Sequence, residues 1–219
     1  MILTPIPPDR LPEILGDFSA TIDDSWTKQV LAGITATSCS RAEGTEAEAH
    51  RLEALALAHH IGMGSLAGPP SAGFSWDGLR LRADTEAYVL LHEIAHYQLA
   101  SPARRKIIDF GLGPGPETGD RAGAERAAIL APAAREREEA AASLLGIIWE
   151  TALGHPALAS FLDQNWLEGA GTPTASWHFT AVLHALRQDG FIDLLGRPLL
   201  QLRSMPDPGE SYRAFAAAE

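Results

Sequence analysis

The sequence predicts a mostly α-helical protein, an α+β fold with minor strand content, formed by a single helical domain over residues 1–219. Three observations support this prediction. Most of the chain carries apolar residues at helical spacing. Leu79–Arg82 alternates apolar and polar residues, which is typical of a short strand. Proline and glycine recur between the helical segments, where helices are expected to begin or end.

The N-terminal part, residues 1–70, is predicted to be helical after an extended lead-in. The lead-in covers residues 1–12, which contain four prolines. Helical patterns follow over residues 13–32 and 45–63, and Thr45 is a candidate N-cap of the second helix. Residues 64–77 are rich in glycine, proline and serine, so a loop is expected there.

After the short strand, Asp84 or Thr85 is expected to cap a helix that runs to about Leu99. A second helix is predicted over Ala103–Phe110, because the preceding Ser-Pro pair can open a helix and a glycine follows it. Residues 111–123 hold five glycines and two prolines. A loop of this length inside a compact domain is often a functional lid or a mobile segment.

The C-terminal half is predicted to be helical almost throughout. The longest pattern covers residues 132–153 and is closed by glycine and proline. A short helix is expected over 156–163, and another opens at Thr172-Pro173 and ends before Gly190. Residues 191–204 are apolar and are interpreted as a further helix.

Charge and cysteine content exclude several classes of function. The chain has 17 basic and 28 acidic residues, so its formal net charge is −11. That argues against DNA binding, which needs a basic face, and favours a cationic partner. The single cysteine, Cys39, fits a reducing compartment, and no signal peptide or apolar run of membrane-spanning length is present. We expect a cytoplasmic protein that binds no membrane.

The segment around His92-Glu93-Ile-Ala-His96 carries the clearest chemical signal. Residues at i and i+4 lie on one face of a helix, so the two imidazoles can converge on one cation. Glu93 lies beside the first histidine and can reach a metal-bound water. This is the HExxH pattern of zinc hydrolases, and it predicts a zincin-like metal helix.

A third ligand should come from another helix, because two histidines supply only part of a coordination shell. Glu139 is the best candidate, since the alanines that follow it allow two helices to pack closely; Glu138 and Glu136 are its rivals. Two histidines and a carboxylate suit zinc, and they also suit non-haem iron(II). Spacing alone does not choose between these metals.

Arg104, Arg105 and Asp109 follow the metal helix closely. One interpretation is that they bind or orient an anionic group near the site. The other is a salt-bridged helical turn, because Arg105 and Asp109 are four residues apart. The remaining histidines lack ligand spacing and are expected to be structural or exposed.

The stretch from His92 to Gly111 resembles the bacterial elongation factor P hydroxylase family. The resemblance is carried by HExxH followed by an aromatic residue, then Ala-Arg104-Arg105, then Asp109-Phe110-Gly111. It continues more weakly through a family-like core of residues 75–202, whereas the first 70 residues match poorly. The resemblance implies a non-haem iron oxygenase that hydroxylates a β-lysylated lysine on elongation factor P. It also implies that Glu139 is the third ligand.

The chain departs from that family at two places. Ala142-Ser143 stands where the family has a Pro-Gln pair, and the glycine-rich loop is longer. These differences leave the substrate open: a modified lysine on elongation factor P, another protein or a small molecule.

Three functions compete at this stage. The first is an Fe(II)- and O2-dependent hydroxylase in which His92, His96 and Glu139 hold iron and Glu93 orients a ligand or water. The second is a zinc metallopeptidase in which Glu93 is the general base. It would need an edge strand to bind peptide, and Leu79–Arg82 is the nearby candidate. The third, a non-catalytic partner-binding protein with a structural metal, ranks last because closed structural zinc sites are usually rich in cysteine and no cysteine is nearby.

Overall fold

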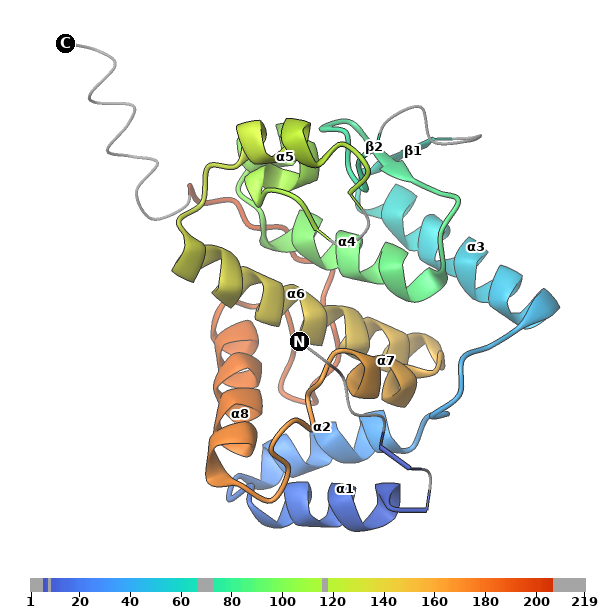
Figure 1. The fold of residues 1–219 in the computed structure, drawn as a ribbon, viewed down its shortest axis with the longest axis vertical. Helices are drawn as coiled ribbons and strands as arrows, with labels where there is room; N and C mark the ends of the chain where they lie inside the picture. Colours follow the sequence, from blue (N-terminus) through green and yellow to red (C-terminus); the bar gives the residue numbers. More distant parts are fainter. Residues whose placement is uncertain (1–5, 8, 67–72, 116–117, 207–219) are drawn as a thin grey trace. The chain divides into compact units, whose positions relative to one another are not determined.

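The computed structural model describes residues 6–7, 9–66, 73–115 and 118–206 (Figure 1). Within these residues the chain has eight α-helices, two 3-10 turns and two short strands, so the prediction of a mostly α-helical fold is confirmed. In this part of the chain every helix is too short or too polar to cross a membrane. The chain divides into two compact units, of residues 1–50 with 143–199 and of residues 51–142 with 200–219.

The first unit is built from α1 (Leu11–Ala20), α2 (Ser25–Thr35), α7 (Ala157–Asp163) and α8 (Pro173–Gln188), together with the start of α3 (Gly44–His60) and the end of α6 (Pro132–Leu153). Its core contains an aromatic cluster. Phe18, Phe161 and Phe179 are fully buried, and their ring centroids lie 5.6–6.1 Å apart in edge-to-face geometry.

The second unit holds the remainder of α3 and α6, with β1 (Gly64–Leu66), β2 (Arg80–Arg82), α4 (Ala87–Leu99), η1 (Arg104–Lys106), η2 (Ile108–Gly111) and α5 (Arg121–Ala127). β1 and β2 pair in parallel, with Ser65 opposite Leu81. On its other edge Leu81 forms an antiparallel bridge with Trp76. β2 therefore lies between two neighbours.

Several helix boundaries are confirmed, and others differ for local reasons. The helices predicted over 132–153, 156–163 and from Thr172 onward match α6, α7 and α8 closely. The single helix predicted over 13–32 is instead α1 and α2, because the Asp24 carboxylate accepts hydrogen bonds from Trp26 N and Thr27 N and caps a new helix.

The predicted caps of two other helices are wrong. Thr45 lies inside α3, which begins one residue earlier. The N-cap of α4 is Glu86, and neither Asp84 nor Thr85. The predicted loop over 111–123 ends early because α5 begins at Arg121; the two residues 116–117 lie outside the described residues, as do 67–72 of the predicted loop 64–77.

Two predicted helices are absent from the described residues. The Ala103–Phe110 segment forms η1 and η2, separated by extended backbone at Ile107. Residues 191–204 contain no helix; a bridge joins Ile192 to Pro198. The Asp193 carboxylate accepts from two backbone N–H groups in the intervening turn, which favours a turn over a helix.

Candidate metal centre

Helix α4 holds the two histidines of the HExxH segment on one face. Leu90, Leu91 and Ile94 are fully buried and fix the rotation of the helix against its surroundings. His92 and His96 lie one turn apart, and their Nε2 atoms are 3.0 Å from each other. The two rings are nearly perpendicular, at 86°. Two imidazole lone pairs can therefore converge on one point.

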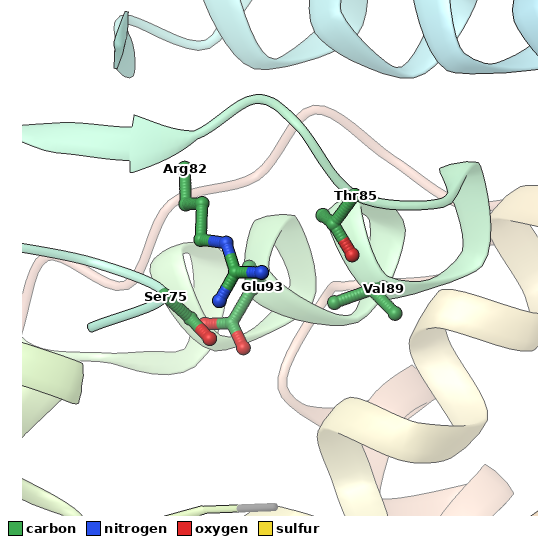
Figure 2. A pocket seen from close by; sticks show the side chains of 5 residues that line it. All are labelled: Ser75, Arg82, Thr85, Val89 and Glu93. Atoms are coloured by element: carbon green, nitrogen blue, oxygen red, sulfur yellow. The ribbon is translucent and has the colours of Figure 1, made fainter. Parts of the chain in front are cut away.

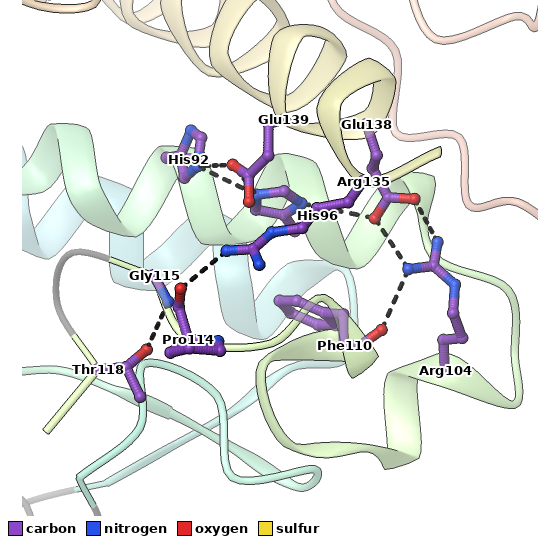
Figure 3. A network of polar contacts seen from close by, with 10 residues as sticks. All are labelled: His92, His96, Arg104, Phe110, Pro114, Gly115, Thr118, Arg135, Glu138 and Glu139. Carbon is purple, nitrogen blue, oxygen red and sulfur yellow. Dashed lines mark hydrogen bonds and ion pairs between the residues drawn. The ribbon is translucent and has the colours of Figure 1, made fainter. Parts of the chain in front are cut away.

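Helix α6 brings a carboxylate to the same point (Figure 3). Glu139 Oε2 lies 3.6 Å from His92 Nε2 and 3.4 Å from His96 Nε2. The three side chains form a group whose ligand atoms all lie within 4.8 Å of one another. Among the residues that the structure describes, these three form the one group of histidine, cysteine or acidic side chains that could hold a metal ion.

The donor set fits a first-row transition metal. Atoms that share such an ion at about 2.0–2.2 Å lie about 3.0–3.5 Å from one another, close to the separations observed here. His96 is buried, and its Nδ1 has no hydrogen-bond partner within normal distance. An imidazole that binds metal through Nε2 keeps its proton on Nδ1, and Glu138 Oε1 lies 3.5 Å from that atom.

The pKa values show how strongly the three groups interact. Burial lowers the pKa of His96, but contacts with Glu138 and Glu139 outweigh it and raise the pKa to about 10. Burial also lowers the pKa of His92, and here that effect prevails. Burial raises the pKa of Glu139, whereas hydrogen bonds from both histidines bring it well below its ordinary value. A cation at the centre would replace the proton on His96.

Glu138, a rival ligand in the sequence, has a different partner. Arg104 is 0% exposed and places its guanidinium against both carboxylate oxygens of Glu138. The same guanidinium donates to the Phe110 carbonyl oxygen at 3.1 Å. Glu138 Oε1 also lies 3.5 Å from His96 Nδ1, on the side away from the ligand atom. Glu136, the other rival, is exposed.

Glu93 is half-buried beside the ligands but outside the group of three. Burial, with the negative charges of Asp109 and Glu139, raises the pKa of Glu93 to about 7 even though His96 lowers it. Its carboxylate lines a pocket with Ser75, Arg82, Thr85 and Val89, and Figure 2 shows the Arg82 guanidinium pointing toward it. Glu93 can therefore hold or accept a proton near neutral pH.

Arg105 and Asp109 do not form the expected ion pair. Arg105 donates to the carbonyl oxygens of Tyr97 and Arg203, at 2.8 and 2.7 Å. Asp109 accepts from the backbone N–H groups of Ser75 and Trp76, at 3.1 and 3.2 Å, and from the Thr118 hydroxyl at 2.9 Å. The helical-turn interpretation of this pair is wrong, because Ile107 is extended.

Sequence reasoning did not find two features of the site. The bond between Arg104 and Glu138 spans 34 residues, and no local spacing indicates it. The second is the Phe110 ring, which stacks on His96 with centroids 5.8 Å apart. A buried arginine cannot be told from an exposed one in the sequence.

The other histidines are not members of the group of three. His59 contacts Ser65 at 2.7 Å, and His155 stacks on His50 at 3.9 Å between centroids. His184 lies 3.1 Å from Asp24.

Comparison of the chain with protein-family models, curated proteins and solved structures gave no match.

Proposed function

We propose that the chain is a non-haem Fe(II)- and O2-dependent hydroxylase similar to the elongation factor P hydroxylases, with a modified lysine side chain as substrate. The observation that carries the proposal is the convergence of His92, His96 and Glu139 within 4.8 Å. Two histidines and one carboxylate would hold a metal and leave other coordination positions open, as non-haem iron oxygenases require. The Arg104-Arg105 and Asp109-Phe110-Gly111 extension of the motif supports this family over a peptidase.

Iron(II), when bound, would supply the activation of O2 for insertion of oxygen into a C–H bond. One oxygen atom becomes the hydroxyl group and the other leaves as water, so each turnover takes two electrons and two protons from an external reductant. The protein would hold the metal through His92, His96 and Glu139. Glu93 would orient a ligand or water and exchange a proton near neutral pH.

Charge favours a cationic substrate. Asp109 and Glu139 lie close enough to raise the pKa of Glu93, and the chain as a whole carries −11. A chain with this net charge attracts an amine such as a lysine derivative and repels phosphate groups. Elongation factor P is therefore the first protein substrate to test. A cytoplasmic location belongs to the same proposal.

A zincin-like metallopeptidase is the second candidate, and one observation favours it. The pKa of Glu93, raised to about 7, suits a general base that takes a proton from zinc-bound water. The strand expected to bind peptide weighs against it. β2 pairs with β1 on one edge, while Leu81 bridges Trp76 and Arg82 N donates to Ser75 O on the other. Neither edge is free to add a peptide strand along these residues.

The experiment that tests the proposal is anaerobic reconstitution with Fe(II), followed by O2 and a reductant such as ascorbate. β-Lysylated elongation factor P and a panel of lysine derivatives serve as substrates. The expected result is a product heavier by about 16 Da that takes up label from 18O2. The zinc-loaded protein, incubated with the same substrates and a peptide library, is the matched control. Peptide cleavage by the zinc form, without oxygen incorporation by the iron form, would favour the peptidase.

A further inference from the structure

Burial of the ion pair between Arg104 and Glu138 costs desolvation free energy. An arginine with 0% exposure has lost its hydration, and a buried ion pair is often no more stable than apolar residues of similar volume. Arg104 contacts both oxygens of Glu138, which fixes the plane of that carboxylate as well as its position. A carboxylate fixed in this way is suited to orient a neighbouring side chain.

Next to Glu138 lies the buried Nδ1 atom of His96, a candidate metal ligand. Glu138 Oε1 lies 3.0 Å from Arg104 Nη1 and 3.5 Å from His96 Nδ1. Nδ1 of His96 is buried and has no hydrogen-bond partner within normal distance. Glu138 Oε1 is thus the carboxylate oxygen poised to accept its proton. On the other side of the same ring, Nε2 faces His92 and Glu139.

We propose that Arg104 is a positioning residue of the metal centre and acts through Glu138. Arg104 fixes the Glu138 carboxylate, and Glu138 holds the proton of His96 on Nδ1 with the ring turned so that the Nε2 lone pair faces the metal. The inference rests on the metal site of the proposed function, but not on which metal it holds or which reaction it serves. A carboxylate behind a ligand histidine strengthens that ligand, and its loss weakens metal binding about 10–100-fold.

The competing explanation is a structural clamp. Arg104 also donates to the Phe110 carbonyl, so the residue ties the 3-10 turns to helix α6 whether or not a metal binds. A clamp would contribute to folding stability and leave metal affinity unchanged. The two explanations are separated by metal affinity and by the hydrogen bond of the His96 Nδ1 proton, measured on variants that remain folded.

The first experiment titrates Co2+ into the purified full chain and follows its visible absorption. Glu138→Ala and Arg104→Met are each expected to weaken Co2+ binding about 10–100-fold. Glu138→Gln should recover part of the loss, because the amide oxygen can still accept from His96 Nδ1. Arg105→Met and Glu136→Gln are the matched controls, since neither side chain contacts His96 or Glu138. Wild-type affinity in folded Glu138→Ala would overturn the inference.

The second experiment observes the His96 Nδ1 proton directly, and it does not depend on Arg104→Met folding. Long-range 1H–15N spectra of the zinc-loaded chain should assign the His96 proton to Nδ1 and the metal to Nε2. In Glu138→Ala zinc still keeps the proton on Nδ1, but the proton signal should move upfield and exchange faster with water because its acceptor is gone; in Glu136→Gln both should stay unchanged. An unchanged shift and exchange rate of this proton in folded, zinc-loaded Glu138→Ala contradict the inference. If the wild-type chain binds neither Co2+ nor Zn2+, the proposed function fails first.

Discussion

The Phe110 ring stacks on the His96 imidazole, with ring centroids 5.8 Å apart and ring planes 24° apart. Phe110 also stacks on Trp76: the two rings are nearly parallel, and their centroids lie 5.6 Å apart. Phe110 and its neighbour Asp109 have positive φ values of 54° and 41°, a conformation that costs about 1–2 kcal/mol per residue. The hydrogen bonds to Asp109 and the burial of Phe110 offset that strain. They hold residues 109–110 beside His96, the candidate ligand.

Phe110→Ala should therefore destabilise the protein strongly. The side chain is fully buried, and removal of a buried phenylalanine costs about 3–5 kcal/mol. Urea unfolding followed by circular dichroism measures the change in the free energy of unfolding. Trp177→Ala is the matched control, because that ring is 70% exposed and its loss should cost less than about 0.5 kcal/mol. A similar small change for both variants would contradict the described packing of Phe110.

Asp109 shows why part of this region could not be predicted from the sequence. Four-residue spacing suggests a helical ion pair with Arg105. The carboxylate instead accepts from the backbone of Ser75 and Trp76, which lie more than 30 residues earlier. Such tertiary hydrogen bonds override local helix propensity, and no local pattern reveals them. α6 was predictable because apolar spacing, an opening proline and a closing glycine all agree over 22 residues.

In the candidate site, too, some residues could be predicted from the sequence and others could not. His92 and His96 follow from spacing alone, since any helix places i and i+4 on one face. Glu138 and Glu139 are adjacent, so they differ by about 100° around the helix, and their roles depend on the rotation of α6. That rotation is set by packing, which the sequence does not display. The structure directs Glu139 to the two Nε2 atoms and Glu138 to Arg104.

Removal of either histidine should abolish stoichiometric metal binding. His92→Ala and His96→Ala each delete one ligand atom, and a site with two remaining protein ligands binds far more weakly. Elemental analysis after dialysis against Fe(II) or Zn(II) measures the metal content. His60→Ala, at an exposed position on α3, should bind metal as the wild type does. Wild-type metal content in either ligand variant would remove the assignment of the site.

The three acidic residues in the first half of α6 should rank in a definite order. Glu139→Ala should weaken metal binding most, because its oxygen faces both histidines. Glu138→Ala should weaken it less, since Glu138 acts behind His96. Glu136→Ala should have no effect at its exposed position. Isothermal titration with Zn2+ gives the affinities, and a greater loss from Glu138→Ala than from Glu139→Ala would mean that the ligand is misassigned.

Glu150 predicts a pH dependence of stability away from the metal centre. It is 2% exposed, and burial raises its pKa from 4.5 to about 7 although Ser160 and Arg41 lower it. The folded chain then keeps a proton that the unfolded chain has released, so stability from this group falls as pH rises from about 4.5 to about 7.

Glu150→Gln removes this titration while preserving the shape of the side chain. Relative to the wild type, the variant should gain stability between pH 5 and pH 8, by at most about 3 kcal/mol. Urea unfolding of both proteins at the two pH values measures the difference. Asp163→Asn is the control, since its side chain contacts the same Arg41 but is 64% exposed. A constant difference between Glu150→Gln and wild type across this range would mean that Glu150 ionises normally.

Glu93→Gln separates the two enzymatic proposals. In a zinc hydrolase Glu93 takes a proton from water, so the variant should keep its metal and lose activity by about 10²–10⁴-fold. In the iron hydroxylase O2 is the oxidant and no water attacks the substrate, so the loss should be about 10–100-fold, as for other groups beside a ligand. Metal content and rate are measured together for the iron and zinc forms. We expect the smaller loss, with hydroxylation retained; peptide cleavage abolished in Glu93→Gln would instead identify Glu93 as the base of a peptidase.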